Sequence, residues 1–538
     1  MRTLLLTFLL LVRAGCSADT PDAAALAQQI VTAHGGPEKL LRTFRFAETY
    51  FLNGKTAPGA GTDRASLVQP PYFWFVGDVE RVGAEKKRSV TEDVWMWTLG
   101  PLVHPRTKLE RLPDAVLEGK PAHTLRISVT IEPPIEASFD AVTHDLVKIV
   151  WNGQQFLFSQ PVEVSGTRVP SRCVLLREGG NEGIRTELRD IQRLAGLPAE
   201  KGRVEDEPLL FTGETRAAAS AQLLRVPSAP PRISSANGTM EFEAGRDFAW
   251  QAGSRTVTLT ADSRIPFKTS AELHPPANAP NSYKQQRGTE QWMFFGPHGL
   301  MHSLQCVANY ASADEWKMPQ PAAAPEEQLG KLRAKLRAKQ PVKLVMLGDS
   351  ISTEADASAL AKVWPFQTGY PSLLAERMES LTGAKVTLAN LAVGGMDSAW
   401  GVTRVADVIK EKPDVLLLAF GMNDASGRRK PEEFASLTKQ MADPVRAALP
   451  DCTVILVTSM TANSEWVHAA PELYPLYAAA LAKLTGPGVA CADVTAAWSA
   501  VEARKKHMDI TGNGLNHPND FGHRLYADTI MAVLGLGK

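Results

Sequence analysis

The stretch Val342–Ser350, with the sequence VKLVMLGDS, decides the fold of the C-terminal part of this chain. Its apolar residues do not alternate with polar ones, which is typical of a strand buried on both faces of a parallel sheet. Similar apolar runs follow in KVTLANLAV, DVLLLAFG, TVILVTS and GVACADV, and helical stretches such as YPSLLAERMESLTG and LYPLYAAALAKLTG separate them. This alternation predicts a parallel sheet covered by helices on both faces, an α/β/α domain at 341–538.

The residues before this domain have a different pattern. After a short helix predicted over 22–33, strand-like runs such as RFAETYFLNG and HTLRISVTIEP alternate with turn residues, which predicts an antiparallel sheet. The polar stretch LPAEKGRVEDEP marks a boundary near residue 200, and the β-rich segment after it fits a sandwich or jelly roll. PQPAAAPEEQ then leads into a linker helix. We expect modules at 19–200 and 201–320, a linker at 321–340 and the α/β/α domain.

The first module has a further likeness. Its helix-then-sheet layout, together with the stretch AHGGPEKL, loosely resembles the half-barrel domains of periplasmic lipoprotein carriers.

The N-terminus predicts export. MRTLLLTFLLLVRAGCSADT places an arginine before a short apolar run that ends in small residues, as in a signal peptide at 1–18. Cleavage could follow Ala18, or it could precede Cys16 and leave a lipid anchor on that cysteine. The mature chain would then be periplasmic or extracellular, and in the second case an outer-membrane lipoprotein. The apolar run is too short to span a bilayer, and no later segment is long enough, so we expect no transmembrane segment.

Composition excludes several classes of partner and cofactor. Lys+Arg and Asp+Glu are both 58 in 538 residues, so the neutral chain has no electrostatic footprint for nucleic acid. The five cysteines form no CxxC pair or Cys/His cluster. His298 and His302 have metal-like spacing, but the neighbouring glycines and proline argue against a helix and no third ligand is evident. We expect no metal and, without a GxGxxG, P-loop or HExxH motif, no cofactor.

In an open parallel sheet, ligands bind at the carboxyl ends of the strands. The first three predicted strands are followed by GDS at 348–350, NLAVGG at 390–395 and GMND at 421–424, and NHPNDFGH stands at 516–523. These four stretches, in this order, resemble the blocks of the SGNH (GDSL) hydrolase family, over about residues 340–538. The resemblance implies a flavodoxin-like fold and ester hydrolysis by a serine.

A serine nucleophile needs a base within hydrogen-bond reach and donors aimed at the oxyanion. Ser350 would supply the hydroxyl, although a serine at this place can also merely cap a helix. His517 would take its proton, unless it is only a loop histidine at a helix start. The resemblance implies that the backbone N–H groups of Ser350 and Gly395 and the side-chain amide of Asn423 form the oxyanion hole.

The sequence departs from the family at the residue that orients the histidine. The family places an aspartate three residues before its histidine, where this chain has Gly514. Three explanations stay open. The upstream Asp509 supplies the carboxylate; a backbone carbonyl orients His517 in a Ser-His dyad; or the domain is degenerate.

Polar and aromatic residues follow the nucleophile. Glu354 and Asp356 could bind substrate hydroxyls or repel an anionic acyl group, or they could only favour the positive end of the next helix. Trp364 and Trp400 could stack on a sugar, or pack in the core. Asp349 and His523 are expected to brace the structure.

The leading hypothesis is a secreted serine esterase. It would remove a short acyl group, with acetyl favoured, from a carbohydrate or similar polyol through an acyl-enzyme. Two alternatives are an O-acyltransferase using the same site and an envelope protein that binds lipid or glycan and keeps a non-catalytic hydrolase domain.

Overall fold

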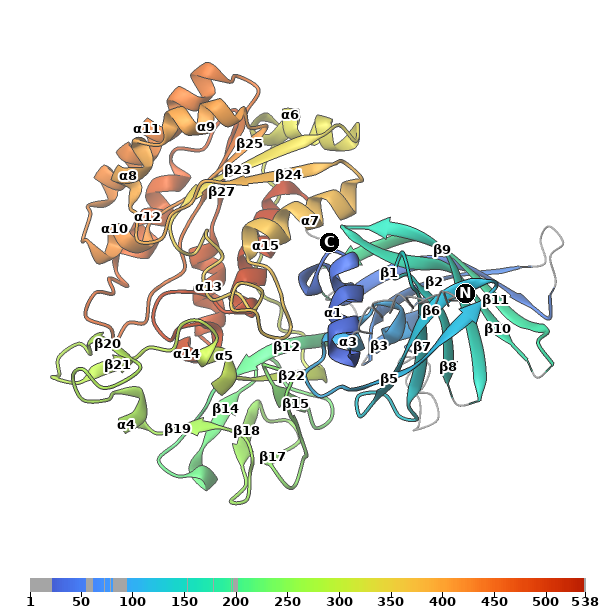
Figure 1. Cartoon of the computed structure of the whole chain (residues 1–538). Coiled ribbons are helices and arrows are strands. Elements are labelled where there is room, and N and C mark those ends of the chain that lie inside the picture. The colour runs from blue at the N-terminus through green and yellow to red at the C-terminus, as the bar shows by residue number, and fades with distance from the viewer. Residues whose placement is uncertain are drawn as a thin grey trace, which may run out of the picture.

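Three β-sheet regions follow one another along the chain (Figure 1). The computed structural model describes residues 22–54, 61–71, 73–77, 79–80, 94–151, 153–177, 179–194, 196 and 202–536. The predicted signal peptide at 1–18, with Cys16, lies outside these residues. Within the described ranges, no helix is long and apolar enough to cross a membrane.

The N-terminal module is built on one eleven-stranded antiparallel sheet, in the order β4-β3-β2-β1-β11-β10-β9-β8-β7-β6-β5. Helices α1 (Ala23–Ala33) and α3 (Gly100–Val103) belong to this module. The side chain of Asp22 caps α1 by accepting a hydrogen bond from the Ala25 N–H, and the apolar stripe of α1 is buried in the module's core. The likeness to lipoprotein carriers stays a prediction. The strands are β1 (Thr43–Leu52), β2 (Thr62–Gln69), β3 (Phe73–Val76), β4 (Val79–Glu80), β5 (Lys108–Leu117), β6 (Lys120–Ser128), β7 (Ile135–Asp140), β8 (Leu146–Trp151), β9 (Gln154–Val164), β10 (Thr167–Leu176) and β11 (Glu182–Leu194).

The middle module contains two small sheets and a hairpin. The sheets have the orders β12-β22-β15-β16 and β17-β18-β14-β13-β19, and side chains from both form one core. Strands β20 and β21 form the hairpin. The elements are β12 (Arg203–Leu209), β13 (Phe211–Thr212), β14 (Ser220–Gln222), β15 (Arg232–Ser235), β16 (Glu241–Phe242), β17 (Phe248–Trp250), β18 (Thr256–Leu259), β19 (Phe267–Lys268), α4 (Ser270–Leu273), β20 (Ser282–Gln285), β21 (Trp292–Phe294), α5 (Leu300–Leu304) and β22 (Cys306–Ala311).

The C-terminal domain has the predicted parallel sheet, in the order β24-β23-β25-β26-β27. Its strands are β23 (Val342–Gly348), β24 (Val386–Asn390), β25 (Val415–Ala419), β26 (Thr453–Val457) and β27 (Val489–Ala492). The helices are α6 (Glu326–Arg337), α7 (Tyr370–Thr382), α8 (Ser398–Val402), α9 (Val405–Glu411), α10 (Met422–Ser426), α11 (Pro431–Ala448), α12 (Leu473–Ala482), α13 (Val494–Glu502), α14 (His507–Ile510) and α15 (Asp520–Leu534).

Helices cover this sheet in two groups. Helix α15 packs against α7 and α13, and α11 packs against α8, α9 and α12. The sheet lies between the two groups (Figure 1), which confirms the expected α/β/α arrangement after two β-rich modules. The chain is therefore multidomain, as predicted.

The core of the C-terminal domain does not end at that domain. Met293, Phe294 and Met301 of the middle module are buried in the same apolar cluster as the parallel strands. The middle module is thus packed into the domain that carries the predicted site.

Candidate active site

Three loops carry the predicted site residues to one edge of the parallel sheet. Ser350 follows β23, Gly395 follows β24 and Asn423 lies in the first turn of α10, directly after β25. Because β23 lies between β24 and β25, the carboxyl ends of these strands are neighbours. This is the place where open α/β sheets bind ligands.

The structure brings His517 to Ser350. The Nε2 atom of His517 lies 2.9 Å from Ser350 Oγ, within hydrogen-bond distance. His517 stands just before α15, and its side chain is 18% exposed, so the imidazole remains open to a substrate.

A carboxylate completes the chain of hydrogen bonds, and it belongs to Asp356. Its Oδ2 atom lies 2.7 Å from His517 Nδ1, and its side chain is only 4% exposed. An ionised carboxylate can only accept hydrogen bonds, so the proton lies on Nδ1 and Nε2 is free to accept the Ser350 proton. The arrangement is that of a Ser-His-Asp triad.

The expectation that Asp509 would orient His517 is wrong. The Asp509 carboxylate is buried against the middle module, where it accepts the backbone N–H groups of Leu210 at 2.7 Å and Lys506 at 3.0 Å. The dyad alternative, with a backbone carbonyl on the imidazole, fails for the same reason: Asp356 already occupies Nδ1.

The loop between β23 and α7 explains how Asp356 reaches the histidine. Glu354 and Asp356 both have left-handed backbone, with φ of 68° and 61°. The Glu354 carboxylate turns away and accepts the N–H groups of Gly369 and Ser372 at the start of α7, so its role is that of a helix cap. Asp356 turns toward His517 instead. From the sequence, Asp356 was expected to contact substrate or to favour the positive end of the next helix. Its role beside His517 was not predicted, because no spacing in the sequence signals it.

The structure gives the hydrogen-bond partners of the three donors predicted for the oxyanion hole. Within the described part of the chain, the N–H groups of Ser350 and Gly395 donate to no backbone carbonyl. The Asn423 Nδ2 atom donates to the Met396 carbonyl at 2.8 Å, which holds that loop and leaves a second N–H on the amide. The assignment of Ser350, Gly395 and Asn423 to an oxyanion hole stays a prediction.

Residues 346–525 match the family described as GDSL-like lipase/acylhydrolase. The C-terminal domain is a GDSL-type hydrolase domain. It is thus of the carboxylic ester hydrolase class, and the resemblance seen in the four sequence blocks is confirmed.

Several solved structures have a likeness to part of the chain. One is the lipase Lip_vut3 from a goat rumen metagenome, with 15% identity over 36% of this chain and 97% of that chain, and a TM-score of 0.30. Another is a two-domain esterase (CEX) active on acetylated mannans, with 23% identity over 40% of this chain and 54% of that chain, and a TM-score of 0.32. A third is a carbohydrate esterase family 3 from Talaromyces cellulolyticus, with 20% identity over 35% of this chain and 94% of that chain, and a TM-score of 0.29. No curated protein matches the chain.

Two further polar residues of the GDSL domain brace the site. Asp349 is buried and accepts the Ile351 N–H at 3.0 Å, and burial raises the pKa of its carboxyl to about 7. His523 is also buried. Its Nδ1 accepts the Tyr370 N–H at 3.3 Å and its Nε2 donates to the Ala355 carbonyl at 3.1 Å, while burial lowers its pKa.

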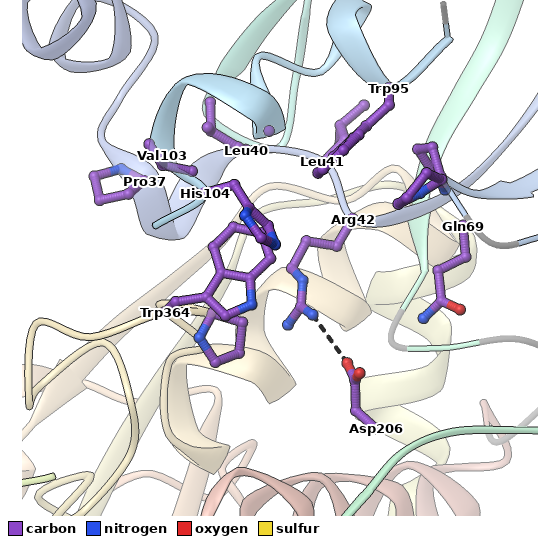
Figure 2. Close-up of a pocket in the computed structure, with 14 residues that line it drawn as sticks. Pro37, Leu40, Leu41, Arg42, Gln69, Trp95, Val103, His104, Asp206 and Trp364 are labelled. Atoms are coloured by element: carbon purple, nitrogen blue, oxygen red, sulfur yellow. Dashed lines mark hydrogen bonds and ion pairs between the residues drawn. The ribbon is translucent and has the colours of Figure 1, made fainter. Parts of the chain in front are cut away.

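The two tryptophans have different surroundings. Trp400 packs edge-on against Phe420. Trp364 lines a small hollow, with a cavity volume of about 40 Å³ and open to solvent, between the N-terminal module and the β23–α7 loop. Figure 2 shows His104 beside Trp364 and Arg42 reaching Asp206 across the hollow. Neither Ser350 nor His517 is among the residues that line it.

The two histidines with metal-like spacing have other surroundings. His302 Nε2 lies 2.7 Å from the Trp364 carbonyl, and the His298 N–H donates to Asp356 Oδ1 at 2.9 Å. In the described ranges, no group of three or more His, Cys, Asp or Glu side chains could hold a metal ion.

Proposed function

We propose that the protein is a secreted serine esterase that hydrolyses short acyl O-esters, with acetyl favoured, of a carbohydrate or similar polyol. The observation that carries this proposal is the hydrogen-bonded chain from Ser350 Oγ through His517 to Asp356. A GDSL-type domain with an open histidine and a buried carboxylate behind it has the parts that acyl transfer to a serine requires.

The first half of the reaction forms an acyl-enzyme. Ser350 Oγ attacks the ester carbonyl carbon while His517 Nε2 takes the hydroxyl proton. The Asp356 carboxylate stabilises the imidazolium that forms. When the tetrahedral intermediate collapses, the bond to the alcohol oxygen breaks and His517 returns its proton to that oxygen. The free alcohol leaves, and the acyl group stays on Ser350.

The amides near Ser350 would stabilise the tetrahedral intermediate. The N–H groups of Ser350 and Gly395 and the amide of Asn423 are the proposed donors to the oxyanion. Loss of one such donor costs about 3 to 4 kcal/mol of transition-state stabilisation. Gly395 has a φ of 79°, a backbone conformation that glycine adopts without strain.

The second half of the reaction uses water. A water molecule gives a proton to His517 Nε2 and attacks the acyl carbon, and the second tetrahedral intermediate releases the carboxylic acid as the proton returns to Ser350 Oγ. No metal or cofactor is needed for this sequence of steps.

The polyol part of the proposal is supported by the surface beside the triad. Asn516 is part-exposed next to His517, and Gly394 and Gly395 are exposed on the side of β24. The side-chain amide and the exposed backbone groups of these residues could form hydrogen bonds with the further hydroxyl groups of a polyol. The export signal predicted at 1–18 would place the enzyme where envelope or extracellular glycans occur.

An assay of four proteins tests the proposal. The wild-type chain and the Ser350→Ala, His517→Ala and Asn423→Ala variants are compared on a chromogenic acetyl ester and on acetylated sugars. We expect wild-type hydrolysis of both, none by the first two variants, and a kcat lowered about 10²- to 10³-fold by the third. Equal hydrolysis by wild type and Ser350→Ala, or none by wild type, would overturn the proposal.

The same assay separates the alternatives. Acetyl transfer to an added sugar faster than release of acetate would favour an O-acyltransferase. Tight glycan or lipid binding without any turnover would favour a binding protein with a non-catalytic hydrolase domain.

A further inference from the structure

The middle module touches the triad directly. Between hairpin β20–β21 and strand β22, residues 296–305 lie against both the β23–α7 loop and the loop before His517. These residues belong to the β-rich module, outside the segment 346–525 that matches the GDSL family.

The first contact is on the triad carboxylate itself. Asp356 Oδ2 meets His517, and Asp356 Oδ1 accepts the backbone N–H of His298 at 2.9 Å. One oxygen therefore faces the imidazole and the other is fixed by the middle module. A charge-assisted hydrogen bond of this kind sets the rotation of the carboxylate as well as its position.

The other contacts hold the chain that carries His517. The Gly296 N–H donates to the Asn513 carbonyl at 3.0 Å. The side chain of Gln305 is 1% exposed, and its Nε2 atom lies 2.8 to 3.0 Å from the carbonyl oxygens of Met508, Asp509 and Thr511, which share its two N–H groups. Its Oε1 atom lies 3.2 Å from Asn519 Nδ2, two residues beyond His517. The middle module thus forms hydrogen bonds with the chain both before and after His517.

We propose that the middle module is a working part of the active site, and that His298, through its main-chain N–H, is a positioning residue that holds Asp356 against His517. This inference rests on the proposed function, since it requires that Asp356 serve the reaction. Within the GDSL segment, the Asp356 carboxylate is held by its hydrogen bond to His517 and lies on an irregular loop with left-handed backbone. The hydrogen bond to its other oxygen comes from the middle module.

The conformation of His298 makes the inference testable. Its side chain is exposed and its φ is 56°, so the N–H reaches Asp356 only while residue 298 keeps a left-handed backbone. A β-branched residue strongly disfavours that region, whereas glycine adopts it freely. His298→Val removes no buried contact, yet it should turn the N–H away from the carboxylate.

Lys284 offers a matched control. It lies in β20 of the same module, is exposed, and has a φ of 54°, but none of its contacts involves Asp356. Lys284→Val therefore imposes a similar backbone strain on the module without touching the triad.

The experiment uses the full chain and measures kcat and KM on the acetyl ester, the melting temperature, and the downfield proton resonance of His517 Nδ1–H, identified by its loss in Asp356→Asn. We expect His298→Val to lower kcat about 10- to 100-fold with little change in KM and to shift or broaden that resonance. His298→Gly should restore most of the lost kcat. Lys284→Val should lower the melting temperature comparably and leave kcat and the resonance unchanged.

The outcomes separate the two proposals. A Ser350→Ala variant with wild-type kcat would defeat the proposed function, whereas an Asp356→Asn variant with wild-type kcat would defeat the triad and, with it, the positioning role of His298. An inactive Asp356→Asn variant together with a fully active His298→Val variant, its resonance in place, would overturn only the positioning role. Equal loss of kcat in His298→Val and Lys284→Val would also overturn it, because the effect would then be one of module stability.

Discussion

At the scale of single residues, the triad depends on how one carboxylate is held. Asp356 sits six positions after Ser350 in the same loop, so both ends of the hydrogen-bonded chain come from one segment and only the histidine comes from elsewhere. Burial of the Asp356 side chain keeps water from competing for the imidazole N–H. A carboxylate so placed fixes the tautomer of His517 and supports its charge in the transition state.

Asp356 and Asp509 can be told apart by substitution. Asp356→Asn should lower kcat about 10³- to 10⁴-fold with a small change in melting temperature, because an amide cannot support the imidazolium. Asp509→Asn should lower the melting temperature and leave kcat within a few-fold, because Asp509 braces the middle module and α14. Steady-state kinetics and thermal unfolding of both variants check this. A large loss of kcat in Asp509→Asn, with kcat unchanged in Asp356→Asn, would instead assign the orientation of His517 to Asp509.

The raised pKa of the Asp349 carboxyl should make the free energy of unfolding depend on pH. Its pKa of about 7 in the folded chain lies above that of an exposed aspartate, near 3.8. Between about pH 4 and pH 7 the unfolded chain loses this proton while the folded chain keeps it, so stability falls as pH rises through that range and the loss levels off above it. Asp349→Asn should gain stability over wild type as pH rises from 4 to 7, by at most about 4 kcal/mol. Urea unfolding at several pH values measures the difference. A difference that does not vary with pH would contradict this.

At the scale of elements, two loops must pass within contact of each other for the triad to form. A Cβ atom on Gly512, in the loop before His517, would lie 2.6 Å from the Asp356 Cβ and 3.0 Å from the Pro518 carbonyl oxygen. Only glycine allows this approach. The glycine-rich stretch TGNGLNH therefore serves the close packing of the histidine loop on the β23–α7 loop.

Gly512→Ala should accordingly push the loops apart. We expect a loss of about 1 to 3 kcal/mol in unfolding free energy, because the added methyl group meets main-chain atoms, and a marked fall in kcat. Gly486 is a matched control in the same domain, since a Cβ there would have open space. Denaturant unfolding and kinetics of Gly512→Ala and Gly486→Ala decide the matter. Equal behaviour of the two variants would show that the close approach is unimportant.

The sequence predicted the elements and the parts of the site that local patterns encode. The buried strands and the helices between them follow from continuous apolar runs. Ser350 follows from a motif at a strand end, and His517 from a motif at the start of the last helix. Asp356 could not be predicted in the same way. Its role depends on a left-handed turn and on a histidine 161 residues away. Neither produces a motif or a periodic pattern in the sequence.

At the scale of the whole molecule, a buried ionic cluster joins the middle module to the GDSL domain. Lys505 and Glu207 have no exposed side-chain surface, and their Nζ and Oε1 atoms lie 2.7 Å apart. The hydroxyl of Tyr310 donates to Glu207 at 2.5 Å, and Lys505 also donates to the Gln222 carbonyl. Because this cluster and the apolar core are shared, we expect the middle module and the GDSL domain to unfold together.

Breaking the pair should destabilise both parts together. Lys505→Met leaves the Glu207 carboxylate buried without its cation, which costs about 3 to 5 kcal/mol. We expect calorimetry to show that the transition shared by the middle module and the GDSL domain moves to lower temperature without splitting. Arg446→Met, at a surface arginine whose Nη2 bonds the Pro487 carbonyl, serves as the control and should change little. Two separate transitions in the wild-type chain would contradict the joint unit.

During turnover, Ser350 should carry the acyl group of the substrate. Rapid mixing of the full chain with a chromogenic acetyl ester, followed by acid quench and peptide mass spectrometry, tests it most directly. We predict the mass of one acetyl group on the peptide that contains Ser350, formed in step with the first release of the chromophore and absent in Ser350→Ala. Turnover without any acetyl on that peptide, or the same label in Ser350→Ala, would contradict the account.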